Sequence, residues 1–215
     1  IFPPMSGKPV LVLFDLGGVM VTLADGMSGA AAAAGMALPR VGETVQAELV
    51  ALSHAYERGE LACEAYFAAA AAKSGLSAQE HRRLHEAFLV APVPGMPELV
   101  EALAAGGVSV GCLSNTNAIH WAQMHEAGGR VGLPMHAMAH RFASHEIGAT
   151  KPDAAIYAHV EAATGLEPAS IVFFDDRAEN VDAAAARGWR AHRVEVGNGS
   201  AERVRAVLAG YGLGS

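Results

Sequence analysis

The fold is decided by the stretch Val10-Leu11-Val12-Leu13-Phe14-Asp15-Leu16-Gly17-Gly18-Val19, in which a short apolar run leads into a carboxylate and two glycines. A run that is apolar at every position is typical of a parallel strand covered on both faces. Open α/β sheets bind ligands at the carboxyl ends of such strands, and glycines there let the backbone approach a ligand closely. The stretch predicts a buried strand at Val10–Phe14 with Asp15 at a ligand-binding edge, although a plain turn is the alternative interpretation of Asp15.

The rest of the chain alternates between strand and helix patterns. The further predicted strands are Val108–Leu113, Met135–Phe142, Ile171–Phe174 and Ala191–Val194. The predicted helices are Met96–Ala105, Asn117–Ala127, Pro152–Thr164, Ala178–Arg187 and Ala201–Ala209. Strands that alternate with helices indicate βαβ units, so the expected fold class is α/β with a doubly wound parallel sheet.

One segment, residues 25–91, departs from this alternation because it contains no strand-like run. Its patterns predict successive helices near Val41–Glu57, Glu60–Lys73 and Ser77–Val90, and a Pro- and Gly-containing linker then returns the chain to the sheet. We therefore expect an α/β core domain at residues 5–24 and 92–215, with an inserted helical domain at residues 25–91.

Composition excludes several classes of protein. The formal net charge of −7 argues against a broad nucleic-acid or anionic-membrane surface, although a small anionic substrate remains compatible with it. No apolar stretch reaches the 18 residues of a membrane-spanning helix. Two distant cysteines, Cys63 and Cys112, form neither a disulfide framework nor a zinc motif, so a cytoplasmic location is expected. The oligomeric state is left open.

Two loops carry groups suited to an anion. The second strand runs into Ser114-Asn115-Thr116-Asn117, which is either an anion site at a helix N-terminus or an ordinary N-cap. Lys151 stands just before a helix, where the helix dipole disfavours a cation unless something anionic compensates. An exposed loop lysine is the alternative interpretation.

A pair of carboxylates, Asp175 and Asp176, follows the fourth strand. Adjacent carboxylates repel unless a cation relieves them, and oxygen ligands suit Mg²⁺, although solvated loop acids are also possible. Asp15, Ser114, Lys151 and this pair all fall at strand carboxyl ends or in the loops after them. Together they form the set of groups that phosphoryl transfer needs: nucleophile, anion holder, cation and metal-binding acids.

The chain resembles the haloacid dehalogenase-like hydrolase superfamily over nearly its whole length. The residues that match its four motifs are Asp15, Ser114, Lys151, and Asp175-Asp176 with Asn180. The inserted helices match the small helical cap that the family places after its first motif. The segments DLGGV, LSNTN, KPDAAIY and FFDDRAEN look like the branch that contains glucose-1-phosphate phosphatases.

The resemblance implies a phosphatase that requires Mg²⁺ and acts through an aspartyl-phosphate on Asp15. It implies a metal held by Asp15, the backbone carbonyl of Gly17 and Asp176, with Asp175 or Asn180 in support.

The resemblance also assigns the phosphate contacts. Ser114, the backbone N–H of Asn115 and Lys151 would hold the phosphate oxygens, and His120 is a candidate substrate contact near the mouth of the site. The substrate would be a small phosphorylated metabolite, such as a sugar phosphate, shielded by the helical cap.

One position departs from the family pattern. Most phosphatases of the superfamily carry a second Asp two residues after the nucleophile as general acid and base, and here that position is Gly17. A catalytically weakened protein that binds a phospho-ligand or a protein partner is therefore the rival hypothesis. A dehalogenase is a further alternative, less favoured because dehalogenases lack the acidic pair. His81 and His85, four residues apart, could bind a metal, but a solvated helix face is the favoured interpretation.

Overall fold

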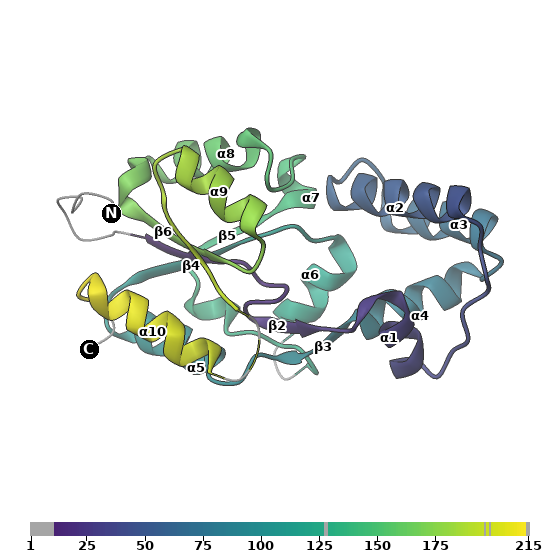
Figure 1. The fold of residues 1–215 in the computed structure, drawn as a ribbon, viewed down its shortest axis with the longest axis horizontal. Coiled ribbons are helices and arrows are strands. Elements are labelled where there is room, and N and C mark those ends of the chain that lie inside the picture. The colour runs from purple at the N-terminus through teal and green to yellow at the C-terminus, as the bar shows by residue number, and fades with distance from the viewer. Residues whose placement is uncertain (1–10, 127–128, 196, 198, 214–215) are drawn as a thin grey trace.

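The computed structural model describes residues 11–126, 129–195, 197 and 199–213, and its centre is a parallel sheet of five strands (Figure 1). The strands, in spatial order, are β5 (His140–Ala143), β4 (Ser109–Ser114), β1 (Leu11–Phe14), β6 (Ile171–Asp175) and β7 (Arg190–Arg193). Every neighbouring pair is parallel. The predicted doubly wound α/β fold is confirmed, with the first strand of the chain at the centre of the sheet.

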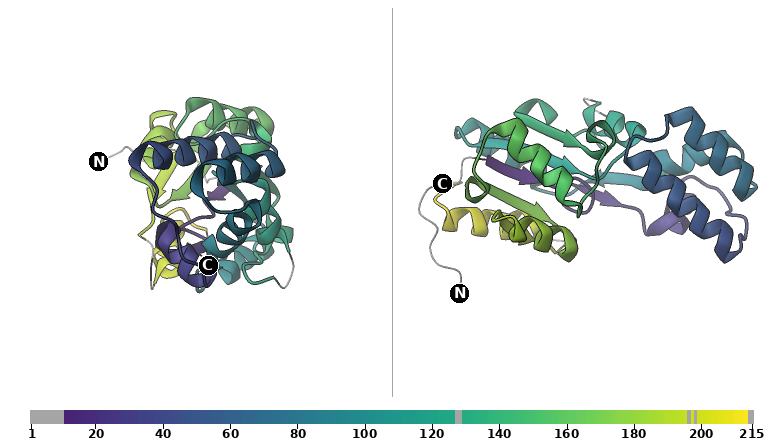
Figure 2. Two further views of the ribbon diagram at one scale, coloured as in Figure 1. Left: turned by 90° about the vertical axis from the view of Figure 1, so that its right-hand side faces the viewer. Right: turned by 90° about the horizontal axis from the view of Figure 1, so that it is seen from above.

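Helices cover both faces of this sheet, as Figures 1 and 2 show. They are α5 (Met96–Ala105), α6 (Ala118–His125), α7 (Ser144–Ile147), α8 (Ala154–Thr164), α9 (Ala178–Ala186) and α10 (Ser200–Gly210). Short 3₁₀ turns occur at Met135–Ala137 and Pro168–Ser170. Because successive side chains of β1 point to opposite faces, Val12 and Phe14 pack with α5 and α10, while Leu11 and Leu13 pack with α8.

The inserted segment forms four helices at one end of the long axis of the molecule (Figures 1 and 2). They are α1 (Gly26–Ala33), α2 (Glu43–Glu57), α3 (Cys63–Ser74) and α4 (Ala78–Phe88). The strands β2 (Val21–Leu23) and β3 (Leu89–Pro92) pair antiparallel and carry the chain into and out of these helices. We call residues 26–88 the helical insert.

Three local predictions differ from the structure. The predicted strand Met135–Phe142 begins as a 3₁₀ turn, and its strand part is only His140–Ala143. The segment 25–91 does contain most of a strand, β3, and it contains the unpredicted helix α1. The apolar run at β3 was hidden because it continues directly from α4, and α1 is Ala- and Gly-rich without a clear periodicity. Val10, Ala127 and residues 5–10 of the predicted core lie outside the described residues.

The insert touches the core at two further places besides the β2–β3 ribbon. Helix α4 packs against α6, and the end of α2 packs against α7. At the second place the backbone of Gly59, which has φ of +68°, lies directly against the carbonyl of His145, so that a Cβ would not fit. Among the described residues, no helix combines the length and apolarity needed to span a membrane.

Candidate active site

The sequence places its polar residues where three neighbouring strands end. Asp15 follows β1, Ser114 is the last residue of β4, and Asp175 is the last residue of β6. Because β1 lies between β4 and β6 in the sheet, these three residues meet at one edge. All three are buried, at 7%, 2% and 0% exposed respectively. This confirms the expectation that they gather at the carboxyl edge of the central strands.

Lys151 connects the two carboxylates of this edge. Its Nζ lies 2.9 Å from Oδ1 of Asp15 and 2.7 Å from Oδ2 of Asp175, and it donates a hydrogen bond of 2.8 Å to the carbonyl of Leu113. Burial alone lowers the pKa of an ammonium group, but here the two carboxylates outweigh burial and raise the pKa of Lys151. The anionic compensation that the position of Lys151 calls for is therefore supplied by Asp15 and Asp175.

Asp15 sits in a strongly perturbed environment. Burial raises its pKa to about 7 and the charge of Asp175 adds to the rise, while Lys151 and the N–H of Leu16 oppose it. The Leu16 N–H donates to Oδ1 at 2.7 Å, so Lys151 and Leu16 hold the same carboxylate oxygen. The other oxygen, Oδ2, accepts no hydrogen bond from the described residues and is free to react.

The two adjacent acids after β6 have different surroundings. Asp175 is fully buried, and its oxygens accept hydrogen bonds from Lys151, the side chain of Asn180 at 3.0 and 3.1 Å, and the N–H of Arg177 at 2.9 Å. Asp176 is half-buried, and burial together with the charge of Asp175 raises its pKa. Among the described residues, the Asp176 carboxylate takes a hydrogen bond from its own backbone N–H and from no other residue. Asp175 is thus already bound within the protein, whereas Asp176 is available.

A metal ion fits this cluster. One oxygen each from Asp15, Asp175 and Asp176 lies within 4.8 Å of the other two, and carboxylate oxygens are the donors that Mg²⁺ prefers. In the described part of the chain no group donates to the carbonyl of Gly17, the fourth predicted ligand. Asn180 donates to Asp175 instead of presenting itself to this cluster, so its role here is to orient that acid.

The second of the two glycines after Asp15 shapes the same cluster. Gly18 has φ of +80°, and a Cβ placed on it would lie 2.5 Å from Oδ2 of Asp176. Gly17 has an ordinary φ, and a Cβ there would lie 3.3 Å from the side chain of Leu23. Gly18, and not Gly17, is therefore the position whose backbone and space require glycine.

The loop after β4 is held by side chains from elsewhere in the core. Asn115 accepts from the N–H of Lys151 and donates to its carbonyl, both at 2.8 Å, which clamps the Lys151 loop to the end of β4. The hydroxyl of Ser114 makes only a 3.5 Å contact with the Asn115 carbonyl, so it remains available to a ligand.

Ser144 is a residue that the sequence did not single out. Its Oγ accepts from the N–H of Thr116 at 2.9 Å and donates to the carbonyl of Glu57, in the insert, at 2.6 Å. Burial raises the pKa of the Glu57 carboxyl, and Arg177, beside the acidic pair, lies close enough to lower it. No sequence motif identifies Ser144 or Glu57, because their contacts join segments that are far apart in the chain.

His120 is the predicted substrate contact whose ring nitrogens are both engaged within the protein. Its Nδ1 accepts from the Asn117 side chain at 3.2 Å, and its Nε2 donates to the carbonyl of His85, in α4, at 2.8 Å. Burial lowers its pKa and so favours this neutral form. In this arrangement His120 joins α6 to the insert and offers no ring nitrogen to a substrate.

His81 and His85 do not lie on a solvated helix face, which corrects that expectation. They are 7% and 8% exposed, and both point into the interior of the insert. His81 bonds to Ser74, with 2.6 Å between Nε2 and Oγ. Neither belongs to a metal-like group of His, Cys, Asp or Glu side chains within the described residues.

Comparisons with known proteins agree with this architecture. A family model described as haloacid dehalogenase-like hydrolase matches residues 10–188. A HAD-family enzyme from Bacteroides thetaiotaomicron has a TM-score of 0.78 at 21% identity, over 93% of this chain and 100% of that one. A predicted HAD-like hydrolase from Porphyromonas gingivalis has a TM-score of 0.77 at 21% identity, over 94% and 98%. An L-2-haloacid dehalogenase from Xanthobacter autotrophicus, with chloropropionic acid covalently bound, has a TM-score of 0.61 at 22% identity, over 94% and 83%.

Proposed function

The chain belongs to the haloacid dehalogenase-like hydrolases, and on that premise we propose that it is a magnesium-dependent phosphatase acting on a small phosphorylated metabolite. The observation that carries the proposal is the placement of Lys151, which is buried between Asp15 and Asp175. The third acid of the same cluster, Asp176, has a carboxylate that bonds to no other residue. In the proposed layout, residues 25–91, which include the helical insert, form a cap domain over a core domain at residues 5–24 and 92–215.

Asp15 is the proposed nucleophile. Leu16 and Lys151 anchor its Oδ1, which leaves Oδ2 to attack phosphorus. As the new bond from Oδ2 to phosphorus forms, the bond from phosphorus to the leaving oxygen breaks and that oxygen takes up a proton. Water then attacks the aspartyl-phosphate, which releases inorganic phosphate and restores the carboxylate.

Asp15 and Asp176, with the carbonyl of Gly17, are the proposed Mg²⁺ ligands. Asp175 is the weaker candidate because both its oxygens already accept hydrogen bonds. Bound Mg²⁺ would offset phosphate charge and favour the ionised form of Asp15, whose pKa of about 7 otherwise leaves much of it protonated at neutral pH. The HAD-family enzyme from Bacteroides thetaiotaomicron was solved with magnesium and inorganic phosphate, which supports the choice of metal and reaction.

The phosphate oxygens are assigned to Ser114, the N–H of Asn115 and Lys151. All three N–H bonds of Lys151 are engaged, with Asp15, Asp175 and the Leu113 carbonyl. Binding phosphate therefore requires Lys151 to exchange one partner, and we expect the contact with Asp15 to be the one exchanged. A cation that follows the transferring group in this way stabilises charge in the transition state.

Gly17 leaves no carboxyl group two residues after the nucleophile to protonate the leaving oxygen. A leaving group that tolerates negative charge needs such a proton less. The proposed substrates are therefore sugar 1-phosphates, whose anomeric oxygen is a better leaving group than a simple alcohol, in agreement with the resemblance to glucose-1-phosphate phosphatases.

Phosphate release from esters of graded leaving-group pKa, with Mg²⁺ and again after metal removal, tests the proposal. We expect turnover only with metal, inhibition by excess Ca²⁺, and kcat/KM that rises as the leaving-group pKa falls. Full activity without metal would exclude the metal role and favour a dehalogenase-type hydrolase. Phosphate-ester binding without turnover would favour the rival, a binding protein. The proposal includes a cytoplasmic location, which two unpaired cysteines support.

A further inference from the structure

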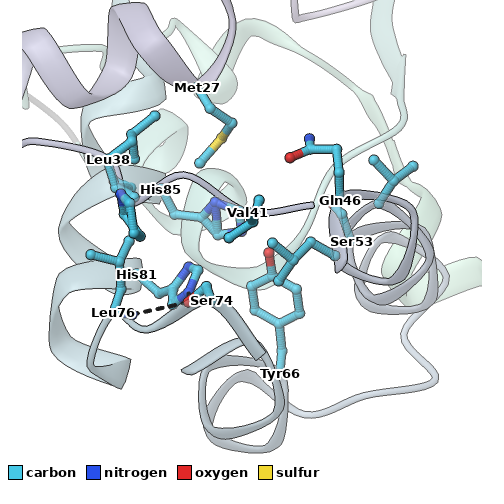
Figure 3. A pocket seen from close by; sticks show the side chains of 14 residues that line it. Met27, Leu38, Val41, Gln46, Ser53, Tyr66, Ser74, Leu76, His81 and His85 are labelled. Carbon is cyan, nitrogen blue, oxygen red and sulfur yellow. Dashed lines mark hydrogen bonds between the residues drawn. The ribbon is translucent and has the colours of Figure 1, made fainter. Parts of the chain in front are cut away.

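The helical insert contains a pocket of its own, separate from the acidic cluster. The pocket has a volume of about 200 Å³. Figure 3 shows side chains from all four helices of the insert, and from the segment between α1 and α2, pointing toward one another around it. None of the residues at the carboxyl edge of the sheet lines it. A cavity of this size matters because an apolar cavity of about 150 Å³ is enough to bind benzene.

The wall of the pocket is uncharged and mostly apolar. Its Leu and Val side chains come from α2, from α4 and from the segments between the helices, and no Asp, Glu, Lys or Arg among the described residues lines it. A charge buried against such a wall would lose its hydration without an oppositely charged partner to offset the loss. A charged ligand is therefore disfavoured, and a neutral, largely apolar ligand is favoured.

One polar group in this wall lacks a partner. His85 is more than nine-tenths buried, and its Nε2 has no hydrogen-bond partner. Its ring stacks on Tyr66, with ring centroids 5.0 Å apart and an angle of 2° between the rings. Burial lowers its pKa to about 3, so the imidazole is neutral at physiological pH. A hydroxyl would satisfy this nitrogen in either tautomer, because a hydroxyl both donates and accepts.

The rim of the pocket exposes apolar side chains to water. Met27, Leu38 and Val50 are 38%, 36% and 45% exposed, and they are three of the five large apolar side chains that reach such exposure in the described part of the chain. Exposed apolar surface that gathers at a concave site is typical of ligand-binding grooves. These three residues extend the apolar wall to the surface.

We propose that the insert pocket binds a neutral molecule, or part of one, with an apolar body about the size of an aromatic ring and a hydroxyl that reaches His85. The occupant is adjacent to the joint with the core, because the His85 carbonyl accepts from His120 and the two rings lie 5.4 Å apart. A ligand of this kind has two sources. It is either a free molecule or the organic part of the phosphorylated substrate.

Binding of p-cresol, measured by NMR titration or calorimetry, tests the proposal without substrate or metal. We expect Kd of about 0.1–1 mM for so small a ligand. The anion 4-methylbenzoate, of similar shape, should bind at least about tenfold more weakly. Failure to detect p-cresol binding up to saturation of its solubility would overturn the proposal, and so would equal affinity for the anion.

Two variants localise the binding. Val41 points into the pocket (Figure 3), so Val41→Trp fills it and should weaken p-cresol binding at least about tenfold. Ala51→Trp, on the exposed side of the adjoining helix α2, is the control and should change Kd less than about twofold. Unchanged binding in Val41→Trp would place p-cresol elsewhere and overturn the proposal.

His85→Phe tests the polar contact and keeps the ring stacked on Tyr66. It should remove the preference for p-cresol over toluene, which we expect to be about three- to tenfold in the wild type from one hydrogen bond. A preference that survives in a folded His85→Phe protein would overturn the role of His85.

Kinetics then separate the two sources, and only this step rests on the proposed function. If the occupant is part of the substrate, Val41→Trp should raise KM for aryl phosphates but not for glycerol phosphate, and p-cresol should compete. If it is a free molecule, KM should be unchanged by Val41→Trp. Absence of any turnover would contradict the proposed function and leave the binding result standing.

Discussion

The acidic cluster of the core and the pocket of the insert are built on opposite principles. In the cluster, the buried charges of Asp15, Lys151 and Asp175 are paired with one another, and Lys151 alone makes three contacts. In the insert pocket the wall is uncharged and mostly apolar, and His85 keeps an unpartnered nitrogen. A network in which buried charges satisfy one another holds one geometry rigidly, whereas an apolar cavity leaves space and costs stability. The reactive groups are therefore held rigidly in the core, whereas the open pocket lies in the insert.

The largest expected effect comes from removing the nucleophile while keeping the network of buried contacts intact. Asp15→Asn should lower phosphate release at least about 1000-fold, because an amide is not a competent nucleophile. The same variant should be no less stable than the wild type in urea unfolding, since burial already favours the neutral form of Asp15. The exposed Asp153→Asn is the matched control and should be normal in both measurements. Near-normal turnover in folded Asp15→Asn would exclude the aspartyl-phosphate.

Removing the cation should show how far the network depends on it. Lys151→Ala leaves two buried carboxylates unpaired, and we expect the free energy of unfolding at pH 7 to fall by about 3–5 kcal/mol. Lys73→Ala breaks the exposed ion pair with Glu48 and should cost less than about 1 kcal/mol. Urea unfolding measures both, and equal losses would mean that the buried contacts of Lys151 contribute nothing special.

Substitutions of two adjacent glycines test which of them the proposed metal-binding edge requires. Gly18→Ala forces a Cβ against Asp176 at a left-handed φ, and we expect a loss of about 1–3 kcal/mol in stability together with weaker Mg²⁺ binding. Gly17→Ala meets only the flexible Leu23 side chain at an ordinary φ and should change either quantity little. Calorimetric titration with Mg²⁺ and urea unfolding give the two readouts, and a larger effect at Gly17 would contradict the assignment.

The smallest expected effect tests the insert through pH. The unfolded chain protonates His85 near pH 6.5, but in the fold its pKa is about 3, so the free energy of unfolding falls as the pH drops below 6.5. At pH 5.5 this loss is about 1.4 kcal/mol relative to high pH, and His85→Phe should abolish that share of it. Unfolding of both proteins at pH 7.5 and 5.5 isolates the difference. Identical pH dependence would mean that His85 is solvated in solution.

The amino-acid sequence was sufficient for the core because its signals are local. Continuous apolar runs identified the strands, and the order of polar groups after them identified Asp15, Ser114, Lys151 and the acidic pair. Parallel strands then place their carboxyl ends at one edge whatever the details of packing. The same local reasoning missed β3 and α1, where an apolar run follows a helix directly and where an Ala- and Gly-rich segment lacks periodicity.

Only the tertiary structure decided which partner each polar group takes. It assigned His120 to the joint with the insert, and glycine at position 18 to the space beside Asp176. It also showed that His81 and His85 point inward and line a pocket for which the sequence contains no motif. A sequence pattern reports the environment of a residue along its own helix or strand, but a hydrogen bond between segments 30 or more residues apart depends on how those elements pack. Chemistry carried by strand ends was therefore determined by the sequence, and chemistry that depends on contacts between the core and the insert was decided by the fold.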